Sequence, residues 1–180
     1  KKNDPNHLNL GIRYGYIEQL DDELLRISKE SFDALSFNCY ALSPDHEKMN
    51  HALEISGLPM IIGEYHFGTV DRGLAQSLWQ VNSQKERGDA FRYYTENAFA
   101  HRGLIGTGWF RWIDQNINGR TDGENYNCGF IDVTDRPYPY MVDAAIKTAK
   151  SLYEIHSGTK TPFHQAPNAV AHSPIPDLWE

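Results

Sequence analysis

One apolar stretch of the chain ends in a carboxylate. Residues 59–68 read Pro-Met-Ile-Ile-Gly-Glu-Tyr-His-Phe-Gly, so Glu64 directly follows a run that is typical of a buried strand. An ionised carboxylate is costly to remove from water unless it has a chemical role or a charged partner. Glu64 is therefore a candidate catalytic carboxylate. The alternative is a structural ion pair with an arginine, for which the candidates are Arg13, Arg72 and Arg111.

Other hydrogen-bonding side chains fall at similar places in the sequence. Asn38 and Tyr40 lie at the end of the apolar run 34–39. Both are candidates to hydrogen-bond a substrate or to orient Glu64, although an asparagine at this place is also a common turn residue. His66 lies two residues beyond Glu64 and faces the same side if the strand continues. We interpret His66 as a polar residue of a binding cleft rather than as a metal ligand.

Two tryptophans precede a carboxylate and an amide. Trp109, Trp112, Asp114 and Gln115 all fall within residues 105–115. Sugars present C–H faces and hydroxyl rims, so flat indole rings beside carboxylate and amide groups suit carbohydrate binding. Trp109 is the better candidate for a stacking platform, whereas Trp112 suits a platform and a core position equally well. All four residues are candidates for substrate binding.

The next loop is rich in polar residues. Residues 114–125 begin like a calcium-binding EF-hand loop, but the twelfth position is Asn125 instead of glutamate and the loop follows a strand. We therefore predict no metal site. The loop is interpreted as facing the substrate, with Arg120 and Glu124 as binding candidates.

Four apolar runs that alternate with helical patterns must position these residues. The runs lack clean polar alternation, as expected for strands that are buried on both faces. Three of the helical patterns are followed by glycines typical of helix ends, Gly57, Gly103 and Gly158. The expected strands are residues 8–12, 34–39, 60–63 and 104–112. One expected helix begins at residues 21–22, and the other three cover residues 45–57, 83–101 and 138–155.

This alternation makes neighbouring strands parallel. Either an open doubly wound sheet or part of a (β/α)₈ barrel fits this pattern. A full barrel has eight βα units and needs about 250 residues, so four units would be half of one. In both architectures the working residues follow the C-terminal ends of strands. Here those segments are residues 13–16, 38–41, 64–71 and 109–124.

Residues 157–180 differ from the rest of the chain in composition and pattern. They contain four prolines and show no hydrophobic periodicity. We interpret them as an extended tail or linker, or as a segment that packs on the surface through Phe163, Leu178 and Trp179.

Composition excludes several classes of protein. The net charge of −7 argues against a nucleic-acid partner, and the longest apolar run, residues 58–62, is too short to span a bilayer. Gly106-Thr-Gly108 lacks the third glycine of a dinucleotide fingerprint, and neither a P-loop nor a hydrolase nucleophile elbow is present. We predict no cofactor. Cys39 and Cys128 can form one disulfide, but two buried thiols are favoured.

The motifs together resemble those of β-agarase-type glycoside hydrolases, within the clan of retaining (β/α)₈-barrel glycosidases. Residues 59–73 are similar to the seventh-strand motif and residues 109–138 to the eighth-strand region. Shorter stretches, residues 4–13 and 35–40, resemble the fifth and sixth strands. The resemblance implies an α/β fold, the (β/α)₈ TIM-barrel glycosidase fold, of which residues 1–156 hold about the last four βα units.

The resemblance also implies roles. Glu64 corresponds to the nucleophile that forms a covalent glycosyl-enzyme intermediate, and the expected substrate is a β-galactoside-containing polysaccharide or oligosaccharide such as agarose. The acid/base in this clan is a glutamate preceded by asparagine, and the chain contains no Asn-Glu dipeptide. We therefore expect a fragment that lacks the acid/base and the N-terminal half of the barrel, and that is nearly inactive and poorly behaved alone. The resemblance further suggests a secreted or periplasmic protein.

Two other functions compete with this hypothesis. A non-catalytic carbohydrate-binding or scaffolding half-barrel would keep the binding residues without the chemistry. An unrelated open α/β enzyme or nucleotide-binding module has no support from the motifs. Carbohydrate and the missing half of the barrel are the expected partners, and neither nucleic acid nor a membrane is expected.

Overall fold

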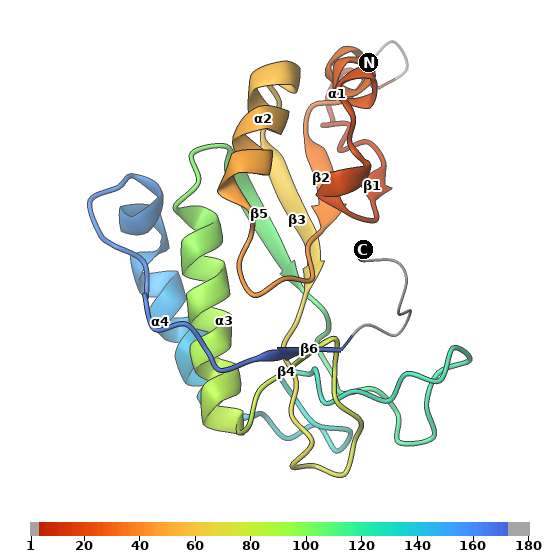
Figure 1. Cartoon of the computed structure of the whole chain (residues 1–180), viewed down its shortest axis with the longest axis vertical. Helices are drawn as coiled ribbons and strands as arrows, with labels where there is room; N and C mark the ends of the chain where they lie inside the picture. Colours follow the sequence, from red (N-terminus) through yellow and green to blue (C-terminus); the bar gives the residue numbers. More distant parts are fainter. Residues whose placement is uncertain (1–3, 173–180) are drawn as a thin grey trace.

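The computed structural model describes residues 4–172 and consists of parallel βα units (Figure 1). Its main sheet has the strand order β1-β2-β3-β5, and all neighbouring strands are parallel. The alternation predicted from the sequence is therefore confirmed. The strands are β1 (Arg13–Tyr14), β2 (Leu35–Asn38), β3 (Met60–Tyr65), β4 (Trp79–Gln80), β5 (Leu104–Trp109) and β6 (Val170–Ala171). The helices are α1 (Asp22–Ser31), α2 (His46–Ser56), α3 (Gln84–Phe99) and α4 (Pro139–His156), with a 3₁₀ helix at Ile17–Gln19.

Side-chain caps fix where three of the helices begin. The Asp21 carboxylate accepts a hydrogen bond from the Leu24 amide at the start of α1. Asp45 and Ser83 cap α2 and α3 in the same way. Because each cap satisfies an amide that has no partner within its helix, these residues define the entry points that the sequence pattern indicated.

The helix ends agree with the sequence pattern at two of three glycines. Gly57 follows α2 with φ 67° and Gly158 lies just beyond α4 with φ 77°, both in the left-handed region that favours glycine. The stop predicted at Gly103 is wrong, because α3 ends at Phe99 and its cap residue Ala100 keeps a right-handed helical conformation. Within residues 4–172, none of the helices has the length and apolarity needed to cross a membrane.

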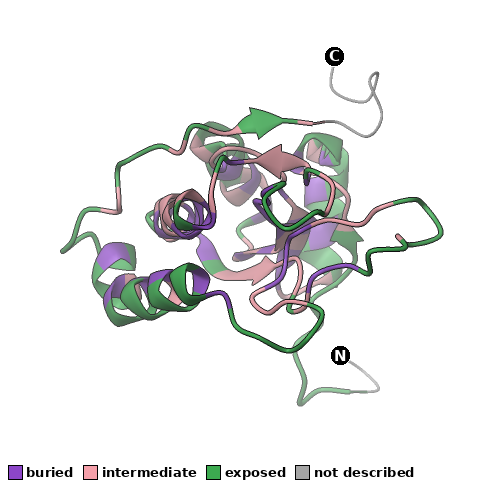
Figure 2. Ribbon diagram, turned by 90° about the horizontal axis from the view of Figure 1, so that it is seen from below, coloured by how far each residue is buried: buried purple, intermediate pink, exposed green. Residues whose placement is uncertain are grey.

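The helices cover one face of the sheet. Strand residues that face them, such as Phe37, Met60 and Ile62, are completely buried and join side chains of all four helices in one hydrophobic core. Figure 2 shows buried stretches in purple on the helices and strands in the middle of the molecule. Residues that alternate with them are less buried, and Ile105 is 54% exposed. The expectation of burial on both faces is therefore wrong, because the four strands leave their other face without a covering layer in the described part of the chain.

The first strand lies later in the sequence than predicted. β1 pairs with β2 through Arg13 and Tyr14, not through residues 8–12. Leu8 and Ile12 are 72% and 61% exposed, so this apolar run does not contribute to the core. The hydrophobic pattern is present, but these side chains lie largely in solvent in the described structure.

The segment after α4 returns across α3, as the blue trace in Figure 1 shows. The Phe163 amide donates to the Glu96 carboxylate over 2.8 Å, and the Phe163 carbonyl accepts from the Asn97 side chain over 3.0 Å. Further on, β6 pairs antiparallel with β4. Leu178 and Trp179, also considered for surface packing, lie outside the described residues.

Both cysteines are buried free thiols, as favoured from the sequence. Burial raises the pKa of Cys39 to about 11 and that of Cys128 to about 12. Both thiols therefore stay protonated at neutral pH and act as small core side chains.

Candidate active site

Glu64 lies near the C-terminal end of β3, where three side chains converge on its carboxylate. Arg13 Nη2 lies 2.9 Å from Oε1. The Tyr40 hydroxyl donates to Oε2 over 2.8 Å, and Asn38 Nδ2 donates to the same oxygen over 3.2 Å. The Glu64 side chain is 18% exposed, so a held carboxylate still has access to a ligand. The structure thus combines the two sequence interpretations, an arginine pair and an accessible carboxylate.

The hydroxyl groups near Glu64 are held in their neutral form. Burial, and then the charge of Glu64, raise the pKa of Tyr40 far above its ordinary value. The same two causes, in the same order, raise the pKa of Tyr16. Tyr40 therefore keeps its proton and is a fixed hydrogen-bond donor to the carboxylate. Asn38 Oδ1 is buried without a hydrogen-bond partner in the described structure, which leaves one acceptor beside the site.

Gly63 makes this convergence sterically possible. A Cβ atom at this position would lie 2.4 Å from Arg13 Cδ and 3.2 Å from Asn38 Oδ1. The first distance is shorter than any real contact, so a side chain here would displace Arg13 from the carboxylate. The glycine before Glu64 is explained by this close approach.

His66 is not a free cleft residue, which corrects the sequence interpretation. Its ring is 2% exposed, and β3 ends before it, at Tyr65. Nε2 accepts a hydrogen bond from the Leu78 amide over 3.1 Å, and Nδ1 donates to the Phe110 carbonyl over 3.1 Å. Both ring nitrogens are thus occupied by backbone groups, and the imidazole links two loops at the edge of the site.

Acid is predicted to destabilise the fold through His66. Burial lowers its pKa to about 3, so the unfolded chain, where imidazole titrates near 6.5, binds the proton first. The stabilisation is complete above about pH 6.5 and is lost as the pH falls towards 3. Between pH 6.5 and 5 the free energy of unfolding should fall by about 2 kcal/mol.

Denaturant titrations over this pH range, with the native chain and His66→Gln, measure the effect. The amide keeps one donor and one acceptor but does not titrate, so the variant should lose most of the slope. His101, whose pKa is lowered by burial and then by its neighbour His46, gives the variant a smaller slope of the same sign. Equal slopes for both proteins would contradict the prediction.

The preference for Trp109 as the stacking platform is wrong, and of the two positions left open for Trp112 the structure has the exposed one. Trp109 packs between Tyr65, Phe91 and Phe130, and its Nε1 donates to the Cys128 carbonyl over 2.7 Å. Trp112 is 68% exposed and stacks on Phe130 with an interplanar angle of 17°. Trp112 therefore offers the flat, open face, and Trp109 is fixed within the aromatic core.

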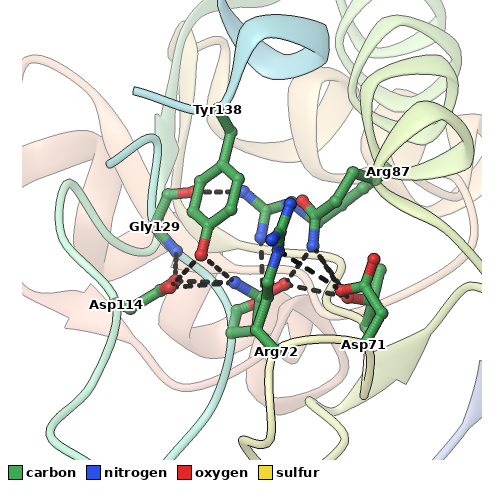
Figure 3. Close-up of polar contacts among 9 residues, drawn as sticks. Asp71, Arg72, Arg87, Asp114, Gly129 and Tyr138 are labelled. Carbon is green, nitrogen blue, oxygen red and sulfur yellow. Dashed lines mark hydrogen bonds and ion pairs between the residues drawn. The ribbon is translucent and has the colours of Figure 1, made fainter. Parts of the chain in front are cut away.

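Asp114 lies in a buried network instead of facing a substrate, which corrects its predicted role (Figure 3). Its carboxylate accepts hydrogen bonds from the Tyr138 hydroxyl over 2.6 Å and from the Gly129 amide over 2.7 Å. Asn127 Nδ2 donates to both carboxylate oxygens, over 2.9 and 3.0 Å. All these partners belong to the same loop region, residues 110–138. The carboxylate therefore closes this loop on itself.

A fully buried arginine completes the network. Arg87, on α3, donates to the carbonyl oxygens of Asn127 and Gly129, and its guanidinium lies 4.5 Å from the centre of the Tyr138 ring. Burial lowers the pKa of Arg87, and the charge of Asp114 opposes this effect. Sequence analysis missed Arg87 because an arginine in a helix usually lies on the solvent side.

Gln115 is also a structural residue, contrary to the prediction. Its side chain is buried, with Oε1 accepting from the Tyr126 amide over 2.6 Å and Nε2 donating to Glu124 over 2.7 Å. Arg120 Nη2 lies 3.4 Å from Glu124 Oε2 at the loop surface, and both side chains stay partly accessible. The described residues contain no cluster of three or more side chains suited to a metal ion.

These observations define a class of protein. Four parallel βα units, with an accessible carboxylate near the C-terminal end of a strand, fit part of a (β/α)₈ barrel. Structure comparison supports this fold, since a solved β-glucuronidase of an uncultured Clostridium sp. shares it at 18% identity with a TM-score of 0.53, over 73% of this chain and 25% of its own.

More similar proteins narrow the class. No protein-family model matches the chain. β-Agarase A of Vibrio sp. (strain JT0107) is 38% identical over 156 residues, and β-agarase B of the same organism is 36% identical over 160 residues. These matches cover 83% and 85% of this chain but only 16% of each relative. A solved exo-β-agarase is 36% identical with a TM-score of 0.79, over 87% of this chain and 21% of its own. A solved agarase is 38% identical with a TM-score of 0.80, over 87% and 24%.

This chain is therefore related to the β-agarase-type glycoside hydrolases. It spans about a sixth of the length of the curated relatives it matches.

Proposed function

We propose that Glu64 is the nucleophile of a retaining glycoside hydrolase. The observation that carries this proposal is the accessible carboxylate held by Arg13, Asn38 and Tyr40 at a strand end. One carboxylate oxygen attacks the anomeric carbon, the glycosidic bond breaks, and the leaving oxygen takes a proton from a second carboxyl group. Water, deprotonated by that second group, then attacks the same carbon and releases Glu64.

The second carboxyl group is proposed to lie outside these 180 residues. A retaining site needs it about 5–5.5 Å from the nucleophile. The chain has no Asn-Glu dipeptide, and Glu124, a nearby loop carboxylate, is bonded to Gln115 and Arg120. We therefore assign the acid/base to the remaining βα units of the barrel.

Surface chemistry supports the proposal that the chain completes its barrel with further βα units. Large apolar side chains are exposed on the two outermost helices of the layer, Leu24 and Ile27 on α1 and Val142, Ile146 and Tyr153 on α4. Figure 1 shows these two helices at opposite ends of the helix layer. Such residues are suited to packing against neighbouring helices. Residues 1–156 are accordingly proposed as the C-terminal half of the barrel, inactive alone, with residues 157–180 outside it.

The substrate is proposed to be a β-galactoside-containing polysaccharide such as agarose. The relatives named as β-agarases at 36–38% identity support this class. The exposed face of Trp112 suits a sugar ring, and the Arg120 and Glu124 side chains suit its hydroxyl groups. These three residues are proposed substrate contacts.

Product stereochemistry in the whole protein tests this function. We expect hydrolysis of agarose with retention at the anomeric carbon, followed by NMR at early times. A slow fluorinated substrate should leave a glycosyl adduct on the peptide that contains Glu64, measured by mass spectrometry. Binding of agarose without hydrolysis would favour the alternative function, a non-catalytic carbohydrate-binding half-barrel. Inversion at the anomeric carbon would exclude Glu64 as a nucleophile.

A further inference from the structure

The segment after α4 reaches the candidate site through β4. We call residues 157–172 the strap. It crosses α3, where the Arg92 guanidinium lies 4.4 Å from the centre of the Phe163 ring, and it ends in β6 (Figure 1). β6 pairs with β4, and the His172 amide adds a hydrogen bond to the Leu78 carbonyl over 2.8 Å. The strap is therefore held at Phe163 and again at its C-terminal end.

β4 in turn holds the residues that directly follow β3. The Gly68 amide donates to the Trp79 carbonyl, and the Val81 amide donates to the Gly68 carbonyl, both over 2.9 Å. One residue earlier, the Leu78 amide donates to His66 Nε2. This connection lies only a few residues beyond the proposed nucleophile.

Both β4 and His66 contact Tyr40, the hydroxyl donor to Glu64. Trp79 Nε1 donates to the Tyr40 carbonyl over 2.9 Å. The His66 ring lies edge-on to the Tyr40 ring, with centroids 5.0 Å apart. Because Tyr40 lies beyond the end of β2, these contacts fix its backbone and its ring where the sheet does not. The hydroxyl end is then aimed at Glu64 Oε2.

We propose that Trp79 is a positioning residue for the nucleophile, which acts through Tyr40, and that the strap holds Trp79 in place through the pairing of β6 with β4. The contacts stand independently, whereas their kinetic effect rests on the proposed function of Glu64. The physical reason is that a nucleophile displaced by about 1 Å can lose up to about 100-fold in rate.

The kinetic test uses Trp79→Phe in the whole protein. Phenylalanine keeps an aromatic ring and removes the N–H donor to Tyr40. We expect kcat to fall about tenfold with little change in KM, because orientation of the nucleophile counts in the transition state. In a Tyr40→Phe background the same substitution should cost nothing further. An equal loss in both backgrounds would show that Trp79 acts independently of Tyr40 and would overturn the proposal.

The strap has its own matched pair of variants. His172→Pro removes the amide that donates to Leu78, whereas His172→Ala keeps it. We expect the proline variant to reproduce the fall in kcat and the alanine variant to match the native protein. Equal kcat values for the two variants would separate the strap from the site.

A spectroscopic readout on the 180-residue chain distinguishes failure of this inference from failure of the proposed function. The ring carbons of Tyr40 are followed by NMR with labelled tyrosine. Trp79→Phe and His172→Pro should shift these signals, and His172→Ala should not. Unshifted signals in Trp79→Phe overturn the positioning role whether or not the whole protein is a hydrolase. Hydrolysis that survives Glu64→Gln overturns the proposed function alone.

Discussion

Replacement of Glu64 with glutamine in the whole protein is expected to abolish hydrolysis of agarose while carbohydrate binding survives. The amide has nearly the same shape as the carboxylate, but it is a very poor nucleophile and carries no charge to pair with Arg13. We expect kcat to fall by at least about 10³-fold, as is typical when a covalent nucleophile is removed. Release of reducing ends measures the rate, and calorimetry with an agaro-oligosaccharide measures binding.

Two further variants show whether the loss belongs to the carboxylate. Tyr40→Phe keeps Glu64 and removes one hydrogen bond to a charged acceptor, so an intermediate loss of about 10- to 100-fold in kcat is expected. Glu54→Gln changes an exposed glutamate near the C-terminal end of α2. This end of the helix lies away from the C-terminal strand ends that carry Glu64, so the rate should stay unchanged. If Glu64→Gln keeps more than a tenth of the native rate, Glu64 is not the nucleophile.

The backbone elements were largely predictable because local physics sets them. Short apolar runs predict β2, β3 and β5 well. Asp21, Asp45 and Ser83 mark the starts of three helices, because each side chain accepts a hydrogen bond from an amide only a few residues away. The two-residue strands β4 and β6 escaped prediction since their pairing joins residues about 90 positions apart. No local pattern carries that information.

The site was predictable only where a strand delivers the side chain directly. Glu64 and Asn38 lie at the C-terminal ends of their strands, Tyr40 lies just beyond β2, and the three converge as expected. Asp114 and Gln115 have the residue types of a carbohydrate site, yet both are buried by partners elsewhere in the loop. A carboxylate or amide in a loop has the same sequence signature whether it meets a substrate or a buried donor, so tertiary contacts decide its role.

Replacement of Asp114 with alanine is expected to be the most destabilising single change in the loop of residues 110–138. The substitution leaves the Tyr138 hydroxyl and the Gly129 amide without their buried acceptor. Asn127 Nδ2 loses the carboxylate and keeps only the Tyr138 hydroxyl as an acceptor. The substitution also removes the negative charge that opposes the desolvation of Arg87. Unpaired buried donors and an uncompensated buried charge together cost about 3–5 kcal/mol. Denaturant unfolding of the 180-residue chain measures this loss.

Asp122 offers a matched control in the same loop. Its carboxylate is exposed and pairs with Arg120 at the surface, so Asp122→Ala should change the unfolding free energy little, because water replaces the lost partner. Arg87→Met tests the network from its other side, since it removes the buried charge and its two carbonyl contacts while filling the space. A small loss for Asp114→Ala would mean that the loop is held elsewhere. A large loss, with Trp112 fluorescence changing before global unfolding, would show that this buried carboxylate supports the proposed sugar platform without touching the substrate.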